Sequence, residues 1–84
     1  MGEVAIRVKV SPESPEIDLE PLEEKVRDQF PVKDVQEEAI GFGLSALKFL
    51  IVRDEDEGGT DDIENELEKV EGVASVEVED VTLL

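Results

Sequence analysis

The first ten residues alternate between apolar and polar side chains, as a strand with one buried face does. Every second position from Val4 to Val10 holds valine or isoleucine, and the positions between them hold Ala5, Arg7 and Lys9. Residues 11–16 contain two prolines, which cannot donate hydrogen bonds to a neighbouring strand. The pattern therefore predicts a strand over residues 1–10 and a turn after it.

A helix is predicted next, because apolar residues now recur three or four positions apart. The face that they form carries Leu19, Leu22, Val26 and Phe30. Asp18 is of the residue type that caps a helix N-terminus, and Pro31 disfavours helical backbone at the residue before it. We expect the helix to begin after Asp18 and to end before Pro31.

Two further strands are predicted on either side of a glycine-flanked aromatic residue. Residues 33–42 are rich in Asp and Glu, which suits the outer edge of a sheet, where charge discourages further pairing. Residues 46–52 are almost continuously apolar, which is typical of a central strand. Between these segments, Gly41-Phe42-Gly43 interrupts both patterns and predicts a turn.

The last third of the chain predicts a second helix and a final strand. Thr60 is a suitable N-cap, and one helical face carries Ile63, Leu67 and Val70. Gly72 is expected to end this helix in the left-handed conformation. Apolar and polar residues alternate again over residues 73–81, which predicts the last strand.

The predicted order of elements is β-α-β-β-α-β. Each helix has one apolar stripe, so both should cover the same face of a four-stranded antiparallel sheet, an α+β sandwich of the ferredoxin-like class. A chain of 84 residues, 39% of them hydrophobic, supports one such domain over residues 1–84. This fold hosts many unrelated functions, so the function has to be argued from particular residues.

The residue types that are missing exclude several kinds of chemistry. The chain has no Cys and no His, which excludes a disulfide, a thiolate metal site and the commonest general base. Its serines therefore have no histidine to activate them. Among its many carboxylates, no single Asp or Glu stands out as a catalytic acid. We expect no catalytic residue and no cofactor.

The acidic stretch from Asp54 to Asp62 has the composition of a calcium loop but not its spacing. An EF-hand loop begun at Asp54 would place Gly58 at position five and Asn65 at position twelve, where a ligand and a bidentate Glu are required. We expect a solvated acidic loop in front of a helix, and no metal site.

The charge of the chain limits its partners. With 24 acidic and 8 basic residues, the net charge is −16, which repels nucleic acid and anionic membrane surfaces and favours a basic protein partner. No apolar run is long enough for a signal peptide or a membrane span, so we expect a cytoplasmic protein, monomeric when free.

Gly41-Phe42-Gly43 admits two interpretations. In the first, which composition alone favours, Phe42 folds back and covers the edge of the sheet. In the second, Phe42 is an exposed aromatic anchor, the residue type that dominates many protein interfaces.

Two binding functions share the predicted order of elements. An RNA-recognition motif would need basic and stacking aromatic residues in the window 40–47, where Phe42 is the only aromatic and Leu44 and Leu47 stand at stacking positions. A small-molecule-binding regulatory domain of the same fold remains the alternative, since its ligand contacts can be mostly to backbone.

Four stretches of the sequence resemble the translation elongation factor 1-beta family in its archaeal type. They are VAIRVKVSPESPEIDLE from Val4, IGFGLSAL from Ile40, EGGTD from Glu57 and EGVASVEVEDVTLL from Glu71. The likeness covers the whole chain, and the order and spacing of the stretches make it specific. Members have the ferredoxin-like fold and act as guanine-nucleotide exchange factors.

The resemblance implies that the chain promotes GDP release and GTP reloading on the GTPase elongation factor 1-alpha, without covalent chemistry. In the family, the aromatic residue of the glycine-flanked turn enters a pocket of the GTPase, which assigns partner binding to Gly41, Phe42 and Gly43. The C-terminal residues are also assigned to partner binding: Val81, Thr82, Leu83 and Leu84. Eukaryotic members carry a penultimate lysine that disturbs the Mg²⁺ and phosphate site. Leu83 stands there in this chain, which leaves wedging and distortion of the switch regions as the expected route.

Overall fold

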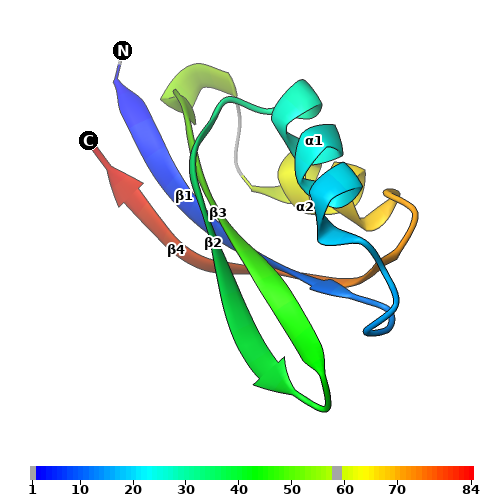
Figure 1. Cartoon of the computed structure of the whole chain (residues 1–84). Helices are drawn as coiled ribbons and strands as arrows, with labels where there is room; N and C mark the ends of the chain where they lie inside the picture. The colour runs from blue at the N-terminus through cyan, green and yellow to red at the C-terminus, as the bar shows by residue number, and fades with distance from the viewer. Residues whose placement is uncertain (1, 58–59) are drawn as a thin grey trace.

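The structure, a computed structural model, describes residues 2–57 and 60–84. Four antiparallel strands form one sheet in the order β2-β3-β1-β4, and both helices cover the same face of it (Figure 1). The strands are β1 (Glu3–Pro12), β2 (Val32–Gly41), β3 (Leu44–Asp54) and β4 (Val73–Leu83). The helices are α1 (Leu19–Gln29) and α2 (Asp61–Glu68), with a short 3₁₀ turn, η1 (Glu55–Glu57), before α2. The predicted order, layers and ferredoxin-like class are confirmed.

Strand β1 extends further than its sequence pattern predicts. The strand was expected over residues 1–10, of which Met1 lies outside the described residues, and it continues to Pro12, which is opposite Val73. The proline is tolerated because it is the last residue of the strand and follows a register irregularity after Ser11. The next amide, Glu13 N, donates a hydrogen bond to the Gly72 carbonyl at 2.9 Å.

Helix α1 has the ends that the sequence predicts. The Asp18 carboxylate accepts a hydrogen bond from Glu20 N at 3.2 Å, which confirms it as the N-cap. The helix ends at Gln29, and Phe30 leaves it with extended backbone directly before Pro31.

Helix α2 departs from the prediction at both ends. Thr60 occupies the N-cap position, but its backbone is helical and its side chain makes no capping hydrogen bond, so the expected capping role is wrong. The acidic Asp61 and Asp62 instead lie in the first turn, where they interact favourably with the helix dipole. Gly72 has the expected positive φ of 95°, yet it lies in the turn before β4 because the helix already ends at Glu68.

The hydrophobic core fills the space between the helices and the sheet. Its fully buried members include Ile6 and Val8 from β1, Phe49 and Ile51 from β3, Val26 from α1, and Ile63 and Leu67 from α2. The stripes that predicted the helices and strands are therefore the surfaces that pack together.

Arg53 is a buried charged residue at the end of this core. Its side chain on β3 is 7% exposed, and Nη1 donates hydrogen bonds to Asp62 Oδ2 at 2.9 Å and to Oδ1 at 3.2 Å. The guanidinium carbon also lies 6.0 Å from the centroid of the Phe30 ring. Arg53 thus joins the end of β3 to the first turn of α2 and to the end of α1.

Candidate functional site

The turn between β2 and β3 consists of two residues with an unusual backbone. Gly41 is paired with Leu44, so Phe42 and Gly43 are the central residues of the hairpin. Their φ angles are 55° and 75°, and positive φ at both positions is the requirement of a type I′ turn. Phe42 is the only residue other than glycine with positive φ in the described ranges 2–57 and 60–84.

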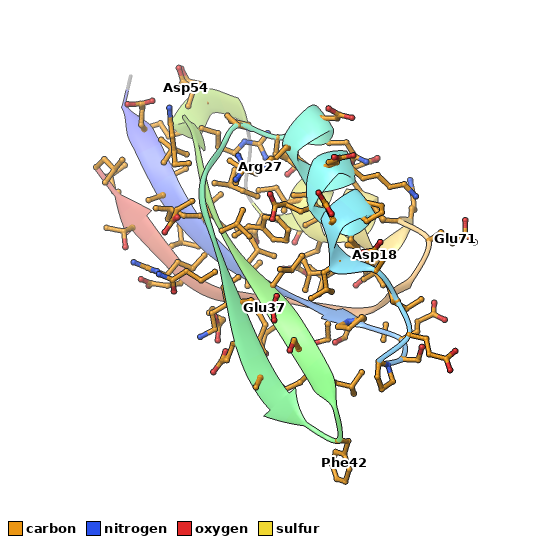
Figure 2. All side chains as sticks on the ribbon, in the orientation of Figure 1. Asp18, Arg27, Glu37, Phe42, Asp54 and Glu71 are labelled. Atoms are coloured by element: carbon orange, nitrogen blue, oxygen red, sulfur yellow. The ribbon has the colours of Figure 1, made fainter. Side chains whose placement is uncertain are left out.

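The side chain of Phe42 projects into solvent. It is 97% exposed, and Figure 2 shows it pointing away from the tip of the hairpin. The interpretation in which Phe42 covers the edge of the sheet is therefore wrong. Figure 1 shows the physical reason: the hairpin extends past both helices, so that neither helix covers the turn.

This conformation strains the backbone and gives the ring no burial in return. A left-handed backbone at a residue with a side chain costs about 1–2 kcal/mol, and leaving phenylalanine in water forgoes about 1.5–3 kcal/mol of burial. The turn could be made with Asn-Gly, which adopts the same backbone readily. A strained and exposed aromatic residue is typical of a binding site, where a partner supplies the burial.

The other predicted partner-binding residues belong to β4 rather than to a free tail. The strand was expected to end at Val81 but continues to Leu83, and Leu84 N donates a hydrogen bond to Glu3 O at 2.8 Å. Three of these side chains are exposed: Val81 by 51%, Leu83 by 66% and Leu84 by 66%. The alternation of Val81, Thr82 and Leu83 was the signal from which the longer strand could have been inferred.

The structure does not bring the two groups of predicted residues together. Strand β3 begins beside the Phe42 turn and ends at Asp54, which is paired with Glu3, the residue that Leu84 contacts. At roughly 3.3 Å per residue, this length of strand spans about 30 Å. The turn and the C-terminal residues lie at opposite ends of the molecule, whose longest dimension is 42 Å (Figure 1).

Two small cavities bear on the small-molecule alternative. One, of about 80 Å³, lies on the face of the sheet away from the helices and is lined by Arg7, Asp34, Gln36, Lys48, Phe49, Leu50 and Glu79. The other, of about 100 Å³, lies beside the hairpin turn and is lined in part by Pro15, Ile17 and Gly43. Ligand sites usually enclose about 300–1,000 Å³. Neither cavity is large enough to enclose a typical metabolite.

No group of three or more Asp or Glu side chains within residues 2–57 and 60–84 could hold a metal ion. No helix in the part of the chain that the structure describes is both long and apolar enough to cross a membrane.

The sheet face away from the helices carries a three-residue ion-pair network. Lys48 Nζ on β3 lies 3.0 Å from Glu38 Oε2 on β2 and 3.5 Å from Glu79 Oε1 on β4. The hydrogen bond from Lys48 and its positive charge hold the pKa of Glu38 below its ordinary value of 4.5. The hydrogen bond to Glu38 in turn raises the pKa of Lys48 above 10.5.

We expect Glu38→Gln to lower the free energy of unfolding slightly at pH 7 and by less at pH 3. A carboxyl group whose pKa is depressed on folding adds stability above its unfolded pKa, and that stability is lost as the pH falls through the folded pKa. Urea unfolding of the wild type and the variant at both pH values measures the difference. Glu37→Gln is the control, because Glu37 is paired with Leu47 and lies on the other face of β2. An equal loss at both pH values would contradict the prediction.

Comparison with known proteins gives matches along the whole chain. Residues 5–84, which include the turn and the C-terminal residues, match the EF-1 guanine nucleotide exchange domain. Elongation factor 1-beta of Methanoculleus marisnigri is 54% identical over 84 residues, which is 100% of both chains. The proteins of the same name from Methanosphaerula palustris and Methanothermobacter thermautotrophicus are 48% and 42% identical, each over at least 99% of both chains.

Proposed function

The chain belongs to the EF-1 guanine nucleotide exchange domain family and acts as an exchange factor for elongation factor 1-alpha, and we propose that Phe42 is the anchor with which it binds this GTPase. The observation that carries the proposal is the 97% exposure of Phe42 on a turn with positive φ at both central residues. An interface explains this arrangement, because the partner would bury the ring that the fold leaves in water.

Exchange by this mechanism requires binding energy and no covalent chemistry. A factor that binds the nucleotide-free GTPase more tightly than the GDP-bound form weakens GDP binding by the same ratio. Burial of one phenylalanine contributes about 1.5–3 kcal/mol, and each 1.4 kcal/mol changes an affinity about tenfold. Phe42 alone could therefore shift GDP binding by about 10- to 100-fold.

The distance between the two candidate regions indicates how the factor engages its partner. Phe42 and Leu83 lie at opposite ends of the sheet, about 30 Å apart, so they cannot enter the same pocket. We propose that they contact separate regions of the GTPase, with the sheet as a rigid spacer between them. Leu83 is apolar and cannot compete with Mg²⁺ as a lysine would, so displacement of the switch regions is the route that its chemistry supports.

The charge of the chain supports a protein partner and a monomeric factor. A net charge of −16 speeds encounter with a basic surface on the GTPase and repels both a second copy and RNA. We therefore propose that the factor binds the GTPase as a monomer and makes no direct contact with nucleic acid.

We expect the GTPase to perturb both ends of the molecule and little between them. The measurement is the backbone amide NMR spectrum of the labelled protein, titrated with nucleotide-free elongation factor 1-alpha. Signals from Gly41 to Gly43 and from Val81 to Leu84 should change first, because these residues would lie in the interface. Lys9 and Glu77, paired in the middle of the sheet, serve as internal controls. Changes centred on those control residues, with the turn unaffected, would contradict the proposal.

A further inference from the structure

The two outer strands of the sheet differ in how well their free edges are protected. Strand β2 carries charged residues along its length: Lys33, Asp34, Glu37 and Glu38. Strand β4 is charged up to Asp80 and has a register irregularity at Glu79, and both features discourage pairing with another chain. The remaining residues, Val81 to Leu84, carry no charged side chain. The protection of this edge therefore stops at Asp80.

The backbone of this segment presents hydrogen-bonding groups to solvent. Leu84 N donates to Glu3 O, so the amide of Leu84 points towards β1. In an antiparallel pair, the N–H and C=O groups of successive residues point alternately towards the partner strand and away from it. The backbone N–H and C=O groups of Thr82 therefore point towards β1. Those of Val81 and Leu83 point outwards from the free edge.

The side chains of the same residues form an uncovered apolar surface. Val81 and Leu83 are opposite Ile6 and Val4 in the register, on the face of the sheet that carries the core. They remain 51% and 66% exposed, and Figure 1 shows the end of β4 lying away from both helices. Outward backbone groups next to alternating apolar side chains are the two features by which a sheet edge binds an added strand.

We propose that the Val81–Leu83 edge of β4 binds an extended segment of the GTPase as a fifth strand of the sheet. The inference rests on the proposed function, in which this end of the molecule contacts elongation factor 1-alpha. Acidic residues flank the edge at both ends, because Asp80 precedes it and the carbonyl of Glu3, on the neighbouring β1, accepts the hydrogen bond from Leu84 N. The added segment should therefore carry apolar side chains at alternate positions and basic residues beside them. A second copy of this chain, also at −16, would meet electrostatic repulsion at the same edge.

The comparison of Leu83→Pro with Leu83→Ala tests the proposal. Both variants remove the leucine side chain, but only proline removes the outward amide that the added strand would use. The ladder to β1 uses the backbone of Thr82 and Leu84, so both free variants should melt at the same temperature. In an assay of fluorescent GDP release from elongation factor 1-alpha, Leu83→Pro should require at least about tenfold more protein than Leu83→Ala for the same rate. Equal activity of the two variants would overturn strand addition.

Hydrogen exchange of the wild-type protein gives an independent test that does not depend on the folding of a variant. The amides of Val81 and Leu83 should exchange rapidly in the free protein and become protected in the complex with the nucleotide-free GTPase. Rapid exchange of both amides in the complex would overturn the proposal. Phe42→Ala in the same release assay separates the two hypotheses, because it tests the anchor alone. If that variant loses activity while Leu83→Pro matches Leu83→Ala, the anchor stands and strand addition fails.

Discussion

Replacement of Phe42 by asparagine is expected to make the protein more stable and far less active. Asparagine is a preferred first residue of a type I′ turn, whereas phenylalanine at φ 55° has the left-handed strain of a residue with a bulky side chain. The free energy of unfolding should rise by about 1 kcal/mol, which corresponds to about 4–8 °C in melting temperature. GDP release from elongation factor 1-alpha should slow by about 10- to 100-fold, because the apolar anchor is lost.

Phe42→Ala separates the two effects. Alanine lacks the ring but keeps nearly the same left-handed strain, so this variant should lose exchange activity by at least about tenfold with little change in stability. Calorimetry and the release of a fluorescent GDP analogue, measured on all three proteins, give the comparison. Near-normal exchange by either variant would refute the anchor. A loss of stability in Phe42→Asn would instead show that the ring contributes to the fold.

Most of the sheet could be predicted from the sequence, because each strand is marked by a pattern of apolar and polar residues within its own segment. Alternation over residues 3–10 and 73–81 marks strands with one buried face, and the apolar run at residues 46–52 marks the centre of the sheet. The acidic β2 was predicted as an edge strand because charged side chains oppose pairing with a further strand. The structure places β2 at the edge of the sheet. Asp18 was also predictable as a cap, because capping depends on residues within one turn of the helix.

Features that depend on distant contacts were not predictable from the local pattern of residues. Whether Phe42 packs on the sheet or faces solvent depends on how far the hairpin extends past the helices, and no local pattern contains that length. The distance between the Phe42 turn and Leu83 depends on the register of the strands, which no local pattern contains either. The Thr60 cap was predicted from residue type alone. In the structure the backbone of Thr60 is helical and its side chain makes no capping hydrogen bond.

Arg53 is the clearest case of a residue whose position could not be read from the sequence. It falls at the end of the apolar run, next to the acidic loop, where a solvent-exposed charge is the ordinary expectation. The structure buries it because the first turn of α2 brings Asp62 within hydrogen-bonding distance. Its burial therefore depends on the path of the chain through η1 and on the position of α2.

Replacement of Asp62 by alanine is expected to cause the largest loss of stability by a change at an exposed site. The Arg53 side chain is 7% exposed and that of Asp62 is 48% exposed, so the pair is intermediate between buried and surface ion pairs. Breaking a buried pair costs about 3–5 kcal/mol, and an exposed pair contributes at most about 1 kcal/mol. We expect a loss of about 2 kcal/mol, which would lower the melting temperature by about 8–16 °C.

Asp61→Ala is the matched control for this prediction. Asp61 lies in the same first turn of α2 and its loss changes the net charge equally, so both variants forgo the same favourable interaction with the helix dipole, at most about 1 kcal/mol. Any further loss in Asp62→Ala therefore measures the contact with Arg53. Thermal unfolding of both variants gives this difference, and equal melting temperatures would show that the ion pair adds no stability. Exchange activity at temperatures well below unfolding should be unchanged in both, because α2 contributes neither the Phe42 turn nor the end of β4.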